Sequence, residues 1–202
     1  LFFIKDSNNG NFSSVALLGF EQGHNLFFQS VNSPAVAYIP NYLACMPFAL
    51  IADPSNNDKL AIGLRNNSSL VNTSGEPLFL DDSKPSQFLQ QIESKLAQHY
   101  QSSQTTQVFV SSLAEQSLLQ ELEVTLTHRD ESKTTLKGLY TISEEKLGKL
   151  SDEQKLRFLS FGYYPPIHAM LASLTQLNRM IQFSQLKETE QYIEGINIKV
   201  VA

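Results

Sequence analysis

The sequence predicts an α+β fold: an N-terminal antiparallel β-meander, then helices, a β-hairpin and C-terminal helices packed on the sheet. Three observations support this class. Up to about residue 71, short apolar runs alternate with turn-forming residues, which is typical of successive strands. Between residues 85 and 101, apolar residues recur at helical spacing. Between residues 122 and 142, two segments of alternating polarity flank a polar turn, which indicates a hairpin.

The meander is divided by residues that end strands. Asn9-Gly10 and Gln22-Gly23 form turns because glycine adopts positive φ at little cost. Prolines at 34, 40 and 47 remove a backbone donor, so strands end beside them or lie at a sheet edge. The candidate strands are residues 1–4, 14–20, 25–31, 35–39, 48–52 and 59–64.

The connector 72–86 separates this region from two predicted helices. The first runs from Pro85 to about Gln101, since proline is tolerated in a first helical turn. The polar segment 101–107 then predicts a break. Ser112 and Glu115 have the spacing of a capping box, which predicts a short second helix ending near residue 119.

The C-terminal half predicts a hairpin and three helices. The hairpin strands are residues 122–126 and 136–142, and a helix follows from 144 to about 150. Ser151 and Gln154 form a second capping box, and Gly162 ends the helix that this box begins. We expect the last long helix from Pro166 to about 183, because Pro165 disfavours helical geometry at the residue before it.

We expect one domain over residues 1–182. The tail, 183–202, is expected either to add a late strand or to be loosely ordered. The chain begins at Leu1 without an initiator methionine, so we expect upstream residues, and any signal peptide, to be missing.

Composition excludes some classes of partner. The formal net charge is −5 and the lysines and arginines are scattered, which argues against a nucleic-acid partner. The longest mostly apolar run, 43–52, is too short to cross a bilayer, so a soluble protein without a membrane span is predicted. The single cysteine, Cys45, excludes an internal disulfide and fits a cytoplasmic location. Its apolar neighbours predict a buried small hydrophobe.

No residue pattern identifies an enzyme or a bound group. The sequence has no Gly-X-Ser-X-Gly, Cys-X-X-Cys or His-Glu-X-X-His, and its four histidines are far apart. We therefore predict no metal, no cofactor and no assigned catalytic residue, and an enzyme is not the favoured class.

The connector holds three carboxylates, on Glu76, Asp81 and Asp82. They could bind a hard cation or receive a basic group of a ligand, because carboxylate oxygens suit both. The favoured alternative is that Asp82 or Ser83 caps the following helix while Glu76 is solvated.

His168 is the second candidate binding residue. In a helix that begins at Pro166 it lies in the first turn, where unpaired amides attract anions and disfavour an imidazolium. Tyr163, Tyr164 and Arg179 are the polar groups that could converge with it on a ligand. The favoured alternative is a histidine that packs against one of the two tyrosines.

Five segments in order resemble the bacterial SapC family, which is named after a surface-layer protein locus. They are "FSSVALLGFEQGHNLF" (12–27), "YIPNYLACMPFALI" (38–51), "GEPLF" (75–79), "LKGLYTISEEKLGKLSDE" (136–153) and "IHAMLASL" (167–174). The resemblance implies a role in surface-layer protein export or peptide transport, and it transfers no catalytic residue. The family pattern has an aromatic residue at the position of His168 and a histidine at that of Met170, so it does not support histidine chemistry here.

Three functions follow. The first is a soluble accessory or binding protein for surface-layer or outer-membrane polypeptides, which requires an exposed apolar groove or strand edge. The second is an enzyme or small-molecule-binding protein with a pocket near the start of the last long helix. The third is a structural subunit that forms a homo-oligomer through its aromatic residues.

Overall fold

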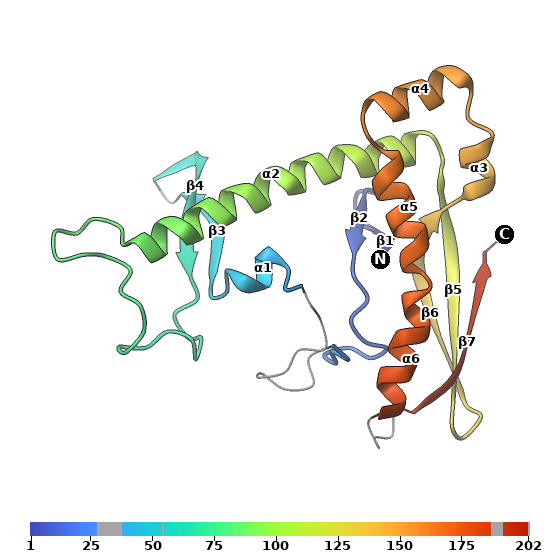
Figure 1. Ribbon diagram of the computed structural model, residues 1–202, viewed down its shortest axis with the longest axis horizontal. Coiled ribbons are helices and arrows are strands. Elements are labelled where there is room, and N and C mark those ends of the chain that lie inside the picture. Colours follow the sequence, from blue (N-terminus) through green and yellow to red (C-terminus); the bar gives the residue numbers. More distant parts are fainter. Residues whose placement is uncertain (28–37, 54, 187–191, 202) are drawn as a thin grey trace. The chain divides into compact units, whose positions relative to one another are not determined.

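The computed structural model describes residues 1–27, 38–53, 55–186 and 192–201 (Figure 1). The predicted α+β class is confirmed. Contacts along the chain divide it into two compact units. Unit 1 comprises Leu1–Ala35 and Thr106–Ala202, and unit 2 comprises Val36–Thr105. Helix α2 (Gln87–Glu115) contributes residues to both.

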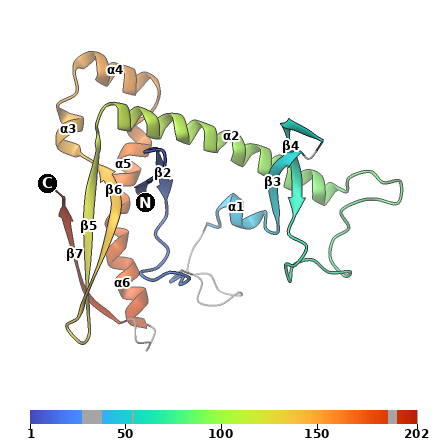
Figure 2. The same ribbon diagram turned by 180° about the vertical axis from the view of Figure 1, so that it is seen from behind.

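Unit 1 contains a five-stranded antiparallel sheet with the strand order β2-β1-β6-β5-β7. Its strands are β1 (Phe2–Lys5), β2 (Phe12–Val15), β5 (Leu119–His128), β6 (Lys133–Ile142) and β7 (Ile193–Val200). The predicted hairpin is confirmed as β5 and β6, which lie side by side with β7 in Figure 2. Of the two alternatives for the tail, residues 193–200 form a strand.

The faces of this sheet differ in polarity. Leu122, Val124 and Leu126 of β5 are buried in one core cluster together with Leu177 and Met180 of α6 (Gln176–Leu186). On the opposite face, side chains pair across β5 and β6. Glu123 lies 3.3 Å from the Lys137 ammonium, and the hydroxyls of Thr125 and Thr135 are 3.2 Å apart. Around these two pairs, β5 and β6 are therefore apolar towards α6 and polar on their other face, whereas Phe3 and Ile142 on that other face are buried in a second core cluster.

Two short helices follow the sheet strands β5 and β6. They are α3 (Glu144–Gly148) and α4 (Asp152–Ser160). The predicted capping box of α4 is confirmed, because the Ser151 amide donates to the Gln154 side chain and the Gln154 amide donates to the Ser151 hydroxyl. Gly162 follows α4 with φ +69°, a conformation that glycine adopts without strain.

The single long helix expected from residue 166 is instead two helices. Helix α5 (Tyr164–Ser173) begins two residues earlier than expected, so the prediction that Pro165 excludes Tyr164 from the helix was wrong. Prolines fit here because the first amides of a helix have no intrahelical acceptor. Ser173 and Thr175 donate their hydroxyls to the carbonyls of Met170 and Ala172, and such bonds compete with the helical ladder where α5 ends.

Unit 2 is built on a second, two-stranded sheet. The elements of this unit are α1 (Asn41–Ala44), β3 (Phe48–Asp53), β4 (Asn56–Leu64) and the first part of α2. Strands β3 and β4 are antiparallel, with Phe48 opposite Leu64 and Leu50 opposite Ile62. These strands confirm the predictions for 48–52 and 59–64, but they belong to a different sheet from β1 and β2.

The rest of the predicted meander is shorter than expected. Of the strand predicted over residues 14–20, only residues 14 and 15 lie in a strand, because β2 ends at Val15. The runs 25–31 and 35–39 fall mostly outside the described residues, and their described parts, 25–27 and 38–39, form no strand. Turn-forming residues in this region separate irregular segments as well as strands.

Helix α2 contradicts the predicted break at residues 101–107 and the predicted cap at Ser112. The helix is continuous from Gln87 to Glu115. The polar segment contains neither glycine nor proline, and the side chains of Thr105 and Ser112 bond to the backbone of the helix itself. The Thr105 hydroxyl donates to the carbonyl of Gln101, and the Ser112 hydroxyl donates to that of Val108.

Candidate functional site

The hairpin of β3 and β4 is apolar on both faces. On one face, Phe48, Leu50 and Ile62 pack against Ile92 and Leu96 of α2. Because side chains alternate along a strand, the intervening residues lie on the other face. Those residues form the cross-strand pairs Ala49–Gly63 and Ile51–Ala61, and none of them is polar. Ile51 is 45% exposed, so this apolar face is open in the described structure.

Gly63 allows the Ile51 side chain to lie across the hairpin. A Cβ atom at residue 63 would be only 3.0 Å from Cγ2 and 3.1 Å from Cδ1 of Ile51. A larger residue at position 63 would therefore have to displace Ile51. The outer face thus has one large apolar side chain, Ile51, beside three small residues, which leaves room for a ligand side chain.

Two adjoining cavities lie on unit 2. The first has a volume of about 390 Å³ and includes Ile51 and Gly63 of the outer face. The second has a volume of about 270 Å³ and extends along residues 70–78 to Phe88. They adjoin each other, because both are lined by Met46, Pro47, Phe48 and Leu64. We call the outer face of the hairpin together with these two cavities the hairpin surface.

Backbone bonds hold the centre of the hairpin surface in place. The Cys45 amide donates to the carbonyl of Asn41, the Phe48 amide donates to that of Cys45, and the Arg65 amide donates to that of Pro47. The peptide bond between Met46 and Pro47 is cis. Cys45 is fully buried in the core of unit 2, which confirms the prediction of a small buried hydrophobe.

Each cavity is lined by a single charged residue. Arg65 lines the first cavity only, and Glu76 lines the second only. Both side chains are exposed, and neither has a hydrogen-bond or ion-pair partner within the part of the chain that the structure describes. The hairpin surface is therefore apolar with a positive group at one cavity and a negative group at the other.

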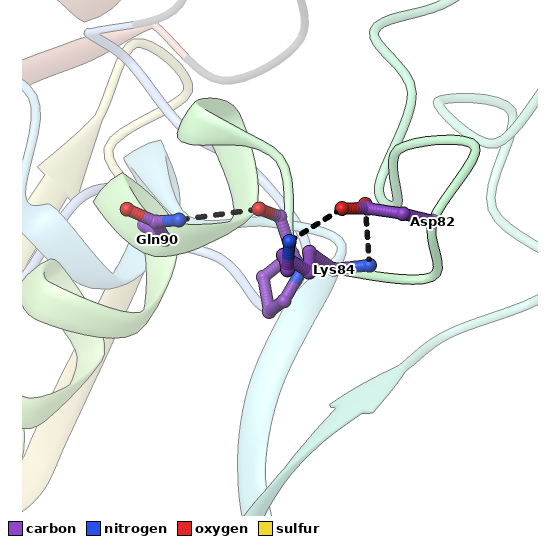
Figure 3. A network of polar contacts seen from close by, with 4 residues as sticks. Asp82, Lys84 and Gln90 are labelled. Carbon is purple, nitrogen blue, oxygen red and sulfur yellow. Dashed lines mark hydrogen bonds and ion pairs between the residues drawn. The ribbon is translucent and has the colours of Figure 1, made fainter.

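The other carboxylates of the connector do not gather with Glu76. Asp82 accepts hydrogen bonds from the Lys84 amide, at 3.2 Å, and from the Lys84 ammonium, at 2.6 Å (Figure 3). These bonds lower the pKa of the Asp82 carboxyl below its usual value. Asp81 is exposed. Across residues 1–27, 38–53, 55–186 and 192–201, no three His, Cys, Asp or Glu side chains are grouped as metal ligands.

The predicted cap of the connector helix was also wrong. Ser86, rather than Asp82 or Ser83, accepts a hydrogen bond from the Leu89 amide at the start of α2. The Gln90 side chain adds a bond to the carbonyl of Pro85 at 3.1 Å (Figure 3). Ser86 is the residue three positions before Leu89, which is the spacing that a capping side chain requires.

His168 lies in the second turn of α5 and not, as expected, in the first. It is the fifth residue of the helix, and two of the three residues that begin α5 are prolines without an N–H group. The start of α5 therefore offers few amides to an anion. The exposed His168 ring stacks on Tyr164, with the ring centroids 6.2 Å apart.

The other candidates of this group, Tyr163 and Arg179, contact side chains other than His168. The Tyr163 ring packs between Phe109 and Phe158, and its hydroxyl is 3.3 Å from that of Ser112. The Arg179 guanidinium lies over the Phe183 ring at 5.2 Å. Only Tyr164 and His168 are brought into contact, and neither described cavity includes these four candidates. A ligand site beside His168 stays a prediction.

A family model, SapC, matches residues 1–180 of the chain, which includes both strands of the hairpin surface and the whole of its lining. The chain belongs to the SapC family. Comparison with curated proteins finds no match, and comparison with solved structures finds none either. Among the residues described for this SapC member, no helix has the length and apolarity that crossing a bilayer requires.

The SapC segments 38–51 and 75–79, which carry part of the resemblance, both contribute to the hairpin surface. Glu76 was a candidate from the sequence, whereas Arg65, Met46 and Ile51 were missed. A signal for the surface was present: the strands 48–52 and 59–64 contain too few polar residues to supply a solvated face. Short, nearly continuous apolar strands indicate burial on both faces, and here the described residues cover only one.

Proposed function

We propose that this SapC-family protein is an accessory protein that binds an extended, apolar polypeptide segment on its hairpin surface. Its role would be the export or handling of surface-layer or outer-membrane polypeptides. The observation that carries the proposal is the apolar centre of the outer face of β3 and β4 together with the two adjoining cavities. Apolar area that stays in water is unfavourable, and a bound apolar segment would remove it from water.

The five-stranded sheet of the same chain supports this interpretation. In unit 1 the part of β5 and β6 that faces away from α6 bears the Glu123–Lys137 ion pair and the Thr125–Thr135 hydrogen bond. Such residues suit a face that stays solvated. The corresponding face of the β3–β4 hairpin has alanine, glycine and isoleucine instead. The hairpin therefore has the composition of a face that a partner covers.

The geometry favours a polypeptide over a compact small molecule. Strands β3 and β4 pair with each other, and no other strand among the described residues pairs with either. Edge strands can pair with an extended segment through main-chain hydrogen bonds, while adjoining pockets accept its side chains. Two open, adjoining cavities match that mode, whereas small ligands are usually enclosed in one concave pocket.

Site-specific photo-crosslinking in the producing cells tests this proposal. A photoreactive phenylalanine analogue would replace Ile51 on the hairpin surface in the full chain. The matched control places the same group at Leu156 of α4, which is 65% exposed but lies outside this surface. We expect exported surface polypeptides among the adducts formed at position 51 and not at position 156. Mass spectrometry of the adducts identifies the partner and the crosslinked segment.

Two outcomes would overturn the proposal. Identical adducts at both positions would show that exposure alone determines capture. Adducts at position 51 that contain only a second copy of the chain would assign the surface to homo-oligomerisation instead.

A further inference from the structure

We propose that Arg65 and Glu76 fix the direction in which the segment binds. The segment would carry an acidic group at one end of its apolar stretch and a basic group at the other. This inference rests on the proposed function, since it specifies the chemistry of the partner that the hairpin surface takes.

The first step is the arrangement of charge along the surface. The cavities adjoin through Met46, Pro47, Phe48 and Leu64, so a segment that fills both passes over these shared residues. Arg65 lines only the first cavity and Glu76 only the second. Such a segment therefore meets a guanidinium in the first cavity and a carboxylate in the second.

The second step is that both charges are available to a ligand. Asp82, a neighbouring carboxylate of the connector, is already bonded to Lys84. Within the described part of the chain, by contrast, the side chains of Arg65 and Glu76 have no such partner. The backbone of Arg65 bonds to Pro47 through its amide, which leaves the guanidinium uninvolved in the fold.

The third step is the effect of binding on these charges. An apolar segment that covers the cavities removes water from Arg65 and Glu76, and a charge that loses water without gaining a partner is destabilising. A segment with an acidic group beside Arg65 and a basic group beside Glu76 compensates both. A segment in the opposite direction places like charges together, which is unfavourable.

Apolar contacts and main-chain pairing do not select the direction by themselves. An edge strand pairs with either a parallel or an antiparallel segment, and the central pairs of the outer face, Ala49–Gly63 and Ile51–Ala61, have no polar group to distinguish them. Arg65 and Glu76, the charged residues that line the cavities, therefore distinguish the two directions of a bound segment.

A random peptide library displayed on phage tests the inference with the full chain as bait. For the wild type we expect peptides with an apolar centre, acidic residues on one side and basic residues on the other, in one consistent order. In the double variant Arg65→Glu with Glu76→Lys we expect the opposite order. Synthetic peptides of the two orders should differ in affinity for the wild type by roughly threefold to tenfold, and the double variant should reverse that preference.

The variant Ile51→Asp separates this inference from the proposed function. If the wild type enriches no apolar peptides relative to Ile51→Asp, the proposed function itself fails. If apolar peptides are enriched without a charge order, or with an order that the double variant leaves unchanged, only the inference about Arg65 and Glu76 is overturned. Circular dichroism checks that the variants fold, which we expect because all three side chains are exposed.

Discussion

The Ile51 side chain lies over Gly63 of the neighbouring strand, with Cγ2 3.0 Å from the position that a Cβ atom of residue 63 would occupy. Ile51 and Gly63 both line the first cavity. Because Gly63 has no side chain, the exposed Ile51 side chain can lie over it. This relationship makes Gly63 a means of changing the surface without altering its charge.

Gly63→Val is expected to weaken peptide binding about tenfold while changing the free energy of unfolding by no more than about 1 kcal/mol. The valine displaces Ile51 and occupies the first cavity, but β-branched residues suit strands, which offsets the crowding. Fluorescence anisotropy with a library-derived peptide and urea unfolding measure the two effects. Gly195→Val is the matched control, because a Cβ there meets nothing within 4 Å and lies in β7, outside the hairpin surface. Equal binding by wild type and Gly63→Val would contradict the prediction.

Leu96→Ala is expected to destabilise unit 2 by about 2–5 kcal/mol, because it leaves a cavity in a close-packed core. Leu96 is 2% exposed and packs with Ile92, Phe48 and Cys45. Tyr100→Ala, on the same helix but 46% exposed, should change the free energy of unfolding by no more than about 0.5 kcal/mol. Urea unfolding compares the two variants. Similar losses for both would show that this part of α2 is not anchored by the core.

Alkaline pH is expected to weaken the five-stranded sheet through Tyr140. Its hydroxyl donates to the Glu121 carboxylate at 3.2 Å, and burial, followed by that negative charge, raises the pKa of the Tyr140 hydroxyl above its ordinary value of 10.0. The folded protein therefore holds this proton more tightly than the unfolded chain does. The resulting stabilisation is fully present below about pH 10 and is lost as the pH rises through the raised pKa of the folded state.

Tyr140→Phe tests this pH dependence. At neutral pH the variant should lose about 1 kcal/mol of stability with its hydrogen bond, and its free energy of unfolding should fall less steeply above pH 10 than that of the wild type. Glu121→Gln keeps an acceptor but removes the charge, so it should retain the part of the alkaline loss that burial causes. An alkaline profile of Tyr140→Phe parallel to that of the wild type would refute the assignment.

Structural features that depend on residues close together in the sequence were predictable. The β5–β6 hairpin and the Ser151–Gln154 capping box depend on short spacings, and both are present. The continuity of α2 and the division into α5 and α6 were missed, because serine and threonine hydroxyls bond to helix carbonyls within α2 and at the end of α5 alike. Propensity alone does not distinguish these two outcomes.

The candidate site was less predictable because it depends on pairing between strands. Ile51 and Gly63 are twelve residues apart, and only the register of β3 with β4 places one over the other. Arg65 is one of several scattered cations in the sequence, and its place in the lining follows from that same register. Glu76 was recognised as a candidate because its connector holds several carboxylates, although the neighbouring Asp82 is bonded to Lys84.

His168→Ala distinguishes the proposed function from an enzyme or small-molecule site at the start of α5. The ring is exposed and its contact is the stack on Tyr164, so the variant should change the free energy of unfolding by no more than about 0.5 kcal/mol. Binding of library-derived peptides should be unchanged, since the hairpin surface contains no residue of α5. Fluorescence anisotropy with the same peptide compares His168→Ala with Ile51→Asp, for which we expect binding to be lost. Loss of binding in His168→Ala, with binding retained in Ile51→Asp, would move the functional site from the hairpin to α5.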